Sequence, residues 1–293
     1  MNKKQPQIQI PLQIADTIAY SRELPHRDTH IRHVRKMTIA GNKITVRKYA
    51  QPISTRRKGI HPLRQPQRSG KLVLTTPETE YKRRQDNLER SKNRFENSVH
   101  ANYPLVPTAY RAPVEITLTY AQTQLNRRQA ISDFQYFIKQ LNKEYGGMTP
   151  LVWHAVLERQ KKRGIKEGNA GTWHIHLVVY NLPYNLRCMI HVLWGLGSIS
   201  VKRKSYGYDS AKSAAYMSKY FIKDAYEIQK GDKVYLCSHN LNKPIEVIRP
   251  WEYEQLATEY YNQGYVKTFI SRIFEIHAIQ NQMKLEVWEP LPT

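Results

Sequence analysis

An alternation of apolar and polar residues between positions 114 and 120 is the clearest pattern in the chain. Ile116, Leu118 and Tyr120 occupy every second position, and polar or charged residues fill the positions between them. Because side chains of a strand point to alternate faces, the pattern predicts a strand with one face in an apolar core. The other face is predicted to carry polar side chains.

Similar patterns along the chain predict strands interleaved with helices. Helical spacing occurs over residues 77–97, 130–145, 186–194 and 210–226, and further strands are predicted over residues 151–158, 173–180 and 198–202. Two strands joined by the polar loop 160–172 are most simply antiparallel. The expected fold is therefore α+β, with a central antiparallel sheet flanked by helices.

The two ends of the chain give weaker patterns. Residues 1–80 are rich in Pro, Gln, Arg and His, with short strand candidates at 43–49 and 71–75. Residues 251–283 favour one or two helices. We therefore expect a basic N-terminal region (1–80) that binds DNA or is partly extended, a main domain (81–250), and a C-terminal helical extension (251–293).

The charge of the chain points to a polyanionic partner. Lys and Arg number 46 against 24 Asp and Glu, a formal net charge of +22, and 22 of these cations against 8 anions fall within residues 1–100. Such a field attracts nucleic acid, although the basic N-terminal region can also be a solvated leader. No apolar stretch has the length of a membrane span or a secretory signal, so no membrane partner is expected and the predicted location is the cytoplasm.

Two histidines one residue apart, His174 and His176, lie in an apolar run. In a strand both imidazoles project to one face, which makes half of a metal site, although strand histidines are more often half-buried polar residues. If the hairpin pairs as expected, Glu158 reaches the same face. Two imidazoles and a carboxylate suit Mn²⁺ or Mg²⁺ acting on a phosphoryl oxygen, with Zn²⁺ as the rival. The alternative for Glu158 is a surface ion pair with Arg159 or Lys161.

A second group of reactive side chains lies in the helix predicted over residues 210–226. Tyr216 and Tyr220 are four residues apart, as are Lys219 and Lys223, so one helical face carries both phenols with the ammonium groups beside them. A tyrosine hydroxyl with a pKa near 10 is a weak nucleophile, which a polarised phosphate and nearby cations can activate. Without that context the spacing is more often an amphipathic core stripe.

The order of these three patterns resembles the HUH endonuclease superfamily, specifically the rolling-circle replication initiators of single-stranded DNA phages and plasmids. The similarity covers residues 88–245 and rests on the strand at 116–120, the His174-x-His176 pair and the tyrosine helix. It implies a five-stranded antiparallel sheet with the histidines on a central strand and the tyrosines on a neighbouring helix. It also implies that His174, His176 and Glu158 hold the divalent metal.

The same resemblance implies an activity. Tyr216 and Tyr220 would attack single-stranded origin DNA, leaving a covalent 5′-phosphotyrosyl DNA adduct and a free 3′-OH that primes synthesis. Members with two tyrosines alternate them between nicking and rejoining, whereas other members use one tyrosine followed by a lysine, and both patterns fit here. Because no phosphate-binding loop of the Gly-x-x-x-x-Gly-Lys type occurs in the sequence, helicase and polymerase are expected in trans from a bacterial host.

Other functions remain open from the sequence. A conjugative relaxase or a single-strand transposase would share the chemistry, but relaxases commonly place the tyrosine before the histidines and transposases are typically shorter. A non-enzymatic DNA-binding protein would use the cations and twenty tyrosines for phosphate contact and base stacking. A zinc-dependent hydrolase would turn over small substrates. Only the nuclease predicts a covalent protein–DNA adduct.

Overall fold

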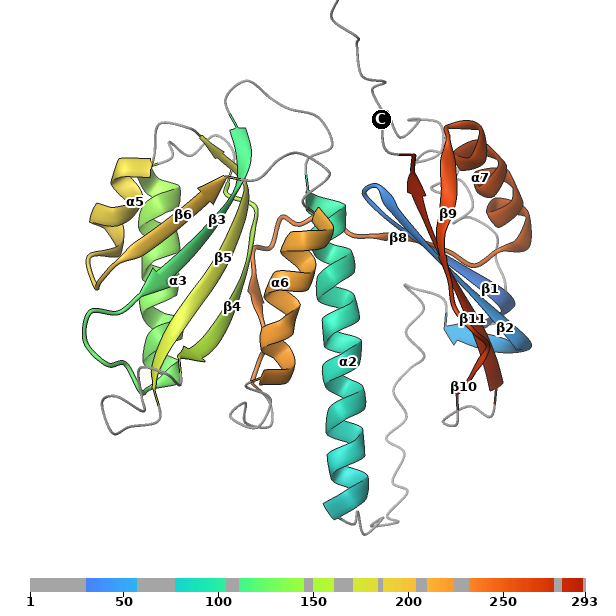
Figure 1. Cartoon of the computed structure of the whole chain (residues 1–293), viewed down its shortest axis with the longest axis horizontal. Coiled ribbons are helices and arrows are strands. Elements are labelled where there is room, and N and C mark those ends of the chain that lie inside the picture. Colours follow the sequence, from blue (N-terminus) through green and yellow to red (C-terminus); the bar gives the residue numbers. More distant parts are fainter. Residues whose placement is uncertain are drawn as a thin grey trace, which may run out of the picture. The chain divides into compact units, whose positions relative to one another are not determined.

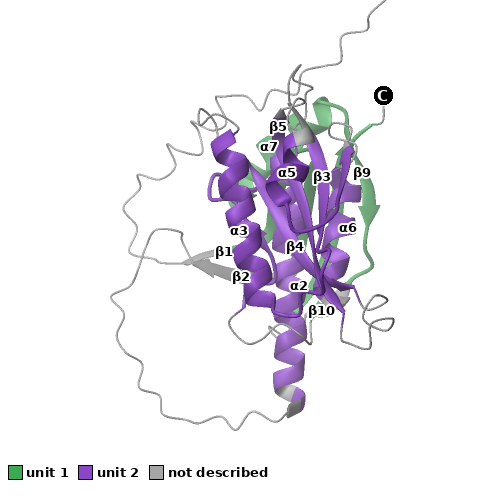
Figure 2. Ribbon diagram, turned by 90° about the vertical axis from the view of Figure 1, so that its left-hand side faces the viewer, with its two compact units in different colours: residues 1–74, 245–293 green, residues 75–244 purple. Residues whose placement is uncertain are grey.

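The computed structural model describes residues 30–56, 77–103, 111–144, 150–160, 171–183, 187–203, 210–223, 232–276 and 281–291. The chain forms two compact units (Figure 2). Unit 2 is continuous and contains Thr75–Pro244, whereas unit 1 combines the two ends of the chain, Met1–Leu74 and Ile245–Thr293. Each unit has its own antiparallel sheet.

Unit 2 is built on a five-stranded sheet with the order β6-β3-β5-β4-β7. The strands are β3 (Arg111–Thr119), β4 (Trp153–Gln160), β5 (Thr172–Pro183), β6 (Ile199–Arg203) and β7 (Leu236–Cys237). Every neighbouring pair is antiparallel, and β5 is the central strand. The expected α+β fold around a five-stranded antiparallel sheet is confirmed.

One face of this sheet is covered by α3 (Arg127–Glu144) and α5 (Arg187–Trp194), as Figure 1 shows. Apolar residues of α3 recur at helical spacing, and Phe134, Phe137 and Leu141 are fully buried. They pack against the alternating apolar residues of β3 and β5, such as Ile116 and Ile175. This core is the larger of the two in unit 2, and it leaves the polar face of the strands to other elements.

The opposite face of the sheet is covered by α2 (Pro77–Asn102) and α6 (Ser210–Lys223), which lie side by side (Figure 1). Small residues on α6 allow the close approach, and two serine hydroxyls tie the helices together. Ser218 donates to Glu96 at 2.7 Å, and Ser210 lies 3.0 Å from Nδ1 of His100. The predicted helix over residues 210–226 is confirmed up to Lys223, and residues 224–226 lie outside the described part.

Unit 1 contains a six-stranded antiparallel sheet with the order β10-β11-β2-β1-β8, and β9 also pairs with β11. The strands are β1 (His30–Ala40), β2 (Lys43–Arg56), β8 (Ile245–Val247), β9 (Tyr265–Ile270), β10 (Phe274–Ile276) and β11 (Asn281–Pro290). The helix α7 (Pro250–Asn262) packs on this sheet through Tyr253, Leu256 and Tyr260. The strand predicted at 43–49 is confirmed within β2, whereas 71–75 lies outside the described residues.

The prediction that residues 251–283 are helical is wrong beyond α7. The helix ends at Asn262, Gly264 adopts a left-handed φ of 84°, and the chain continues into strands. Tyr265–Ile270 is rich in aromatic and β-branched residues, which favour a strand once a partner is available. That partner is β11, which also pairs with β2 from the other end of the sequence. Local periodicity does not reveal such long-range pairing.

Candidate active site

The predicted ligands lie on the face of the central sheet that α6 covers. In the β4–β5 pairing Glu158 is directly opposite His174, and Val156 is opposite His176. The alternation of the two strands therefore places Glu158, His174 and His176 on one face. Both imidazoles are buried, with 8% and 6% of their surface exposed.

His176 is the centre of this site. Its Nε2 lies 2.8 Å from Oε2 of Glu158, and its Nδ1 lies 3.3 Å from the hydroxyl of Thr117 and 3.4 Å from that of Tyr216. The ring of Tyr220 stacks on the imidazole with centroids 4.3 Å apart and an angle of 8° between the planes. One side chain thus joins a carboxylate of β4, a hydroxyl of β3 and both tyrosines of α6.

The donor atoms fit part of a divalent-metal site. Nε2 of His176 and Oε2 of Glu158 are 2.8 Å apart, close to the separation of about 3 Å between adjacent ligands of an octahedral ion with bonds of about 2.1 Å. His174 lies on the same face, opposite Glu158. Within the described ranges, however, no three His, Cys, Asp or Glu side chains are gathered in an arrangement that could hold a metal ion. A site with all three ligands stays a prediction.

The two tyrosines of α6 differ in their environments although they look alike in the sequence. Tyr216 is 37% exposed, whereas Tyr220 is 5% exposed and belongs to the core between α6, α2 and the sheet. Their rings meet edge to face with centroids 5.5 Å apart. Burial, followed by hydrogen bonding with Tyr216 and the nearby charge of Glu158, raises the pKa of Tyr220. Tyr216 is therefore the more accessible of the two hydroxyls.

A lysine lies across both tyrosine rings. The Nζ atom of Lys219 is 4.0 Å from the ring centroid of Tyr216 and 4.7 Å from that of Tyr220. An ammonium group at this distance attracts the negative face of a phenol ring and would stabilise a phenolate more strongly. Lys223 ends α6, and its side chain lies outside the described part of the structure.

A cavity of about 330 Å³ opens beside Tyr216 and His176. Its walls include Thr117 of β3, Lys202 of β6 and Lys212 of α6. The sequence reasoning did not select these three residues. The available signal was the alternation of β3 and β6, which faces Thr117 and its neighbour Ser200 toward the same side as the histidines. Their charge and hydroxyl groups suit a phosphate beside the tyrosine.

Buried hydrogen bonds fix α6 over this face. The Ser213 hydroxyl donates to Oε1 of Glu115 at 2.7 Å and lies 3.4 Å from the hydroxyl of Tyr103. Glu115 is on the polar face of β3, so the bond ties the tyrosine helix to the strand beside the histidines. Buried polar groups that are paired in this way specify one position for a helix.

Comparison with known families supports a role in replication. A family model described as replication-associated protein ORF2 matches residues 113–225, which contain β3, both histidines and the tyrosine helix. This match supports a replication initiator. No curated protein and no solved structure matches the chain. None of the helices described has the length and apolar composition required to cross a bilayer.

Proposed function

We propose that this protein is a rolling-circle replication initiator that nicks and rejoins single-stranded DNA at an origin through a 5′-phosphotyrosyl intermediate. The observation that carries the proposal is the contact of both tyrosines with His176, whose other nitrogen lies 2.8 Å from Glu158. Nucleophile candidates and metal-ligand candidates thus share one small site. The family match covers the same elements.

The reaction needs a tyrosine oxygen, a phosphate and a leaving group in line. A phenol oxygen of Tyr216 or Tyr220 forms a bond to the phosphorus, the bond from phosphorus to the 3′-oxygen breaks, and the phenol proton is given up while the 3′-oxygen gains one. Lys219, which lies over both rings, would stabilise the developing phenolate. Rejoining is the reverse reaction, with a 3′-OH attacking the phosphotyrosine.

Glu158, His174 and His176 would hold a divalent cation, Mn²⁺ or Mg²⁺ by the chemistry of the donors. When bound, such an ion polarises the phosphoryl oxygens and makes the phosphorus more electrophilic. Lys202 and Lys212, in the cavity beside Tyr216, would bind the DNA backbone next to the scissile phosphate.

The two tyrosines suit a division of the two reactions. Tyr216 is exposed beside the cavity, so it would make the first attack on incoming DNA, and Tyr220 would act on the second strand transfer. The 3′-OH released by the first attack would prime synthesis by a host polymerase, with a host helicase opening the duplex. Origin DNA, polymerase and helicase are the partners that this proposal requires, in the cytoplasm of a bacterial cell.

The decisive experiment is capture of a covalent adduct. The protein is incubated with a randomised single-stranded DNA library and Mn²⁺, denatured in detergent, and the DNA that remains attached is sequenced. The wild type is expected to retain a defined sequence by its 5′ end. Oligonucleotides of that sequence then test Tyr216→Phe, Tyr220→Phe and the double variant, with Tyr136→Phe, an exposed tyrosine of α3, as the matched control.

The double variant is expected to form no adduct, and Tyr136→Phe is expected to behave as the wild type. An adduct in the double variant would refute the assignment of the nucleophiles. Loss of all activity in one single variant with none in the other would refute the alternating use of two tyrosines. Binding without any adduct from the wild type would favour a non-enzymatic DNA-binding protein.

A further inference from the structure

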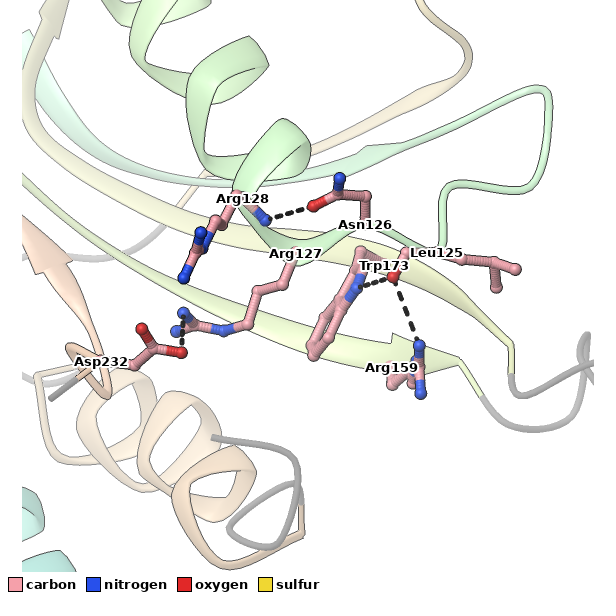
Figure 3. A pocket seen from close by; sticks show the side chains of 7 residues that line it. All are labelled: Leu125, Asn126, Arg127, Arg128, Arg159, Trp173 and Asp232. Atoms are coloured by element: carbon pink, nitrogen blue, oxygen red, sulfur yellow. Dashed lines mark hydrogen bonds and ion pairs between the residues drawn. The ribbon is translucent and has the colours of Figure 1, made fainter. Parts of the chain in front are cut away.

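A second and larger cavity, of about 610 Å³, lies at the end of the central sheet where β4 ends and β5 begins (Figure 3). Arg159 of β4 and Trp173 of β5 form one wall, and Arg127 and Arg128 at the start of α3 form another. The volume is in the range of pockets that hold a small ligand or one nucleotide, about 300–1,000 Å³. None of these residues takes part in the reaction proposed above.

The cavity is close to the candidate active site. Arg159 pairs with Trp173 in the β4–β5 register, and the next pair along is Glu158 with His174. Neighbouring Cα atoms are about 3.8 Å apart, and their side chains point to opposite faces of the sheet. The two sites therefore flank the same end of the hairpin, within the length of one or two nucleotides of an extended strand.

Guanidinium groups dominate the charge of the cavity. Arg127 donates to Asp232 at 3.2 Å and to the carbonyl of Lys233 at 2.7 Å, so its charge is balanced by one carboxylate. Arg128 is exposed and Arg159 is half-buried. With three arginines and one aspartate in its lining, the cavity has an excess of positive charge that suits a phosphodiester.

The end of α3 does not itself supply this attraction. The side-chain oxygen of Asn126 accepts hydrogen bonds from the amides of Arg128 and Gln129, at 2.9 and 3.3 Å, so the first turn of the helix is already capped. An anion in the cavity would have to be bound by the arginine side chains.

The guanidinium of Arg159 is held in place by Trp173. It lies over the indole ring at 5.1 Å, and it donates to the carbonyl of Leu125 at 3.4 Å, which also accepts a hydrogen bond from the indole nitrogen at 3.1 Å. Trp173 is buried, so the indole fixes the plane of the guanidinium from behind. A fixed guanidinium plane is a surface on which a nucleic-acid base can stack.

We propose that this cavity binds one nucleotide of the single-stranded substrate beside the scissile phosphate. Arg127 and Arg128 bind its phosphate, and the Arg159 guanidinium, supported by Trp173, stacks with its base. The inference rests on the proposed function, because it assigns this cavity to the same DNA strand. It does not require that either tyrosine react.

The test measures DNA binding in the absence of chemistry. The affinity of the full chain for a fluorescent oligothymidylate is measured by anisotropy in EDTA at several salt concentrations. Arg128→Ala and Arg159→Ala are each expected to weaken binding by roughly threefold to tenfold, and the slope of log affinity against log salt should fall by about one for Arg128→Ala. Lys139→Ala, which removes an exposed cation from the same helix α3, is the matched control.

Arg159→Lys keeps the charge but not the planar group, so it is expected to weaken binding as Arg159→Ala does. Wild-type affinity in Arg159→Lys would overturn the stacking role. Equal affinities for all variants and the Lys139→Ala control would overturn the nucleotide site as a whole. In that case an adduct formed by the wild type would show that the proposed function stands without it.

Photocrosslinking gives a second readout that does not depend on variants. Oligothymidylate containing 4-thiothymidine is irradiated with the wild-type protein, and the modified peptides are identified by mass spectrometry. Crosslinks to the segment Leu125 to Arg128 or to Arg159 are expected. Crosslinks confined to other parts of the chain would overturn the inference. A crosslink in this cavity without any covalent adduct in the capture assay would instead place the failure in the proposed nicking reaction.

Discussion

At the scale of single residues, burial distinguishes side chains that the sequence presents as equivalent. Tyr216 and Tyr220 both contact His176, yet only Tyr220 is part of the core. The alternative interpretation of the tyrosine spacing, a core stripe on an amphipathic helix, thus holds for the position of Tyr220. The structure adds that a core tyrosine can still present its ring to the histidine that defines the site.

We predict that Glu158 contributes to metal binding. Mn²⁺ binds the native state only, so saturating Mn²⁺ should raise the melting temperature of the wild type. Glu158→Gln removes one anionic ligand and should abolish most of this increase, measured by thermal unfolding with and without Mn²⁺. Glu96→Gln is the control, because Glu96 accepts a hydrogen bond from Ser218 on α6 rather than facing the histidines. Equal Mn²⁺ stabilisation in both variants would contradict the ligand assignment.

His154 should make the stability of the protein depend on pH. It is fully buried between Ser98 and Tyr180, and burial lowers its pKa to about 3. Below the ordinary histidine pKa of about 6.5 the unfolded chain binds a proton that the native state does not. The free energy of unfolding should therefore fall as the pH falls from about 6.5 toward 3.

The measurement is urea unfolding at a series of pH values, comparing the wild type with His154→Gln. The variant is expected to be less stable near neutral pH, since it disturbs two hydrogen bonds, and to lose less stability on acidification. The same pH dependence in both proteins would show that His154 is not responsible. His191, on α5, offers a control through His191→Gln, because it is exposed.

At the scale of elements, the site depends on how α6 is seated on the sheet. Met217 and Phe221 anchor the helix in the core with α2, and Ser213 ties it to Glu115 of β3. The other face of the sheet is covered by α3 and α5, which carry no proposed catalytic residue. Two packed faces of one sheet thus have separate roles, one for stability and one for the site as well.

Phe221→Leu and Phe137→Leu form a pair that separates these roles. Both phenylalanines are fully buried, one on α6 and one on α3. Each change should lower the free energy of unfolding by about 1–3 kcal/mol. Only Phe221→Leu is expected to slow adduct formation, measured well below the melting temperature of both variants, because it shifts the tyrosines against His176. Equal rates in the two variants would contradict the dependence on the seating of α6.

At the scale of the whole molecule, the two units differ in how their sequence is assembled. Unit 2 is one continuous segment with both of its cores, and it contains every residue of the proposed site. Unit 1 needs β1 and β2 from the start of the chain and β8 to β11 from the end. The charge is also uneven, since residues 1–74 contain 16 Lys and Arg against 3 Asp and Glu, whereas residues 245–293 contain 4 against 7.

We predict that Thr75–Pro244 folds alone and forms the covalent adduct. Its affinity for single-stranded DNA should depend less steeply on salt than that of the full chain, because the 16 cations of residues 1–74 are absent. Circular dichroism, thermal unfolding and adduct formation are the measurements. Deleting residues 245–293 instead should unfold unit 1 but leave the reaction intact. Loss of the adduct from a folded 75–244 fragment would show that unit 1 contributes to the site.

Much of unit 2 was predictable because its signals are local. The alternation in β3, the helical spacing of α3 and α6 and the His174–His176 pair each arise within about ten residues. The polar face of the β4–β5 hairpin follows from the period of a strand, so Glu158 could be placed near the histidines before the register was seen. These features need only backbone geometry and side-chain polarity.

The sequence by itself determined the elements of unit 2, the order of its motifs and the excess of positive charge. Only the tertiary structure decided which tyrosine is buried, that Thr117, Lys202 and Lys212 border the site, and that the two ends of the chain share one sheet. The physical reason is distance along the chain. Periodicity reports how each segment divides its polar and apolar sides, whereas burial and strand pairing depend on segments tens to hundreds of residues away.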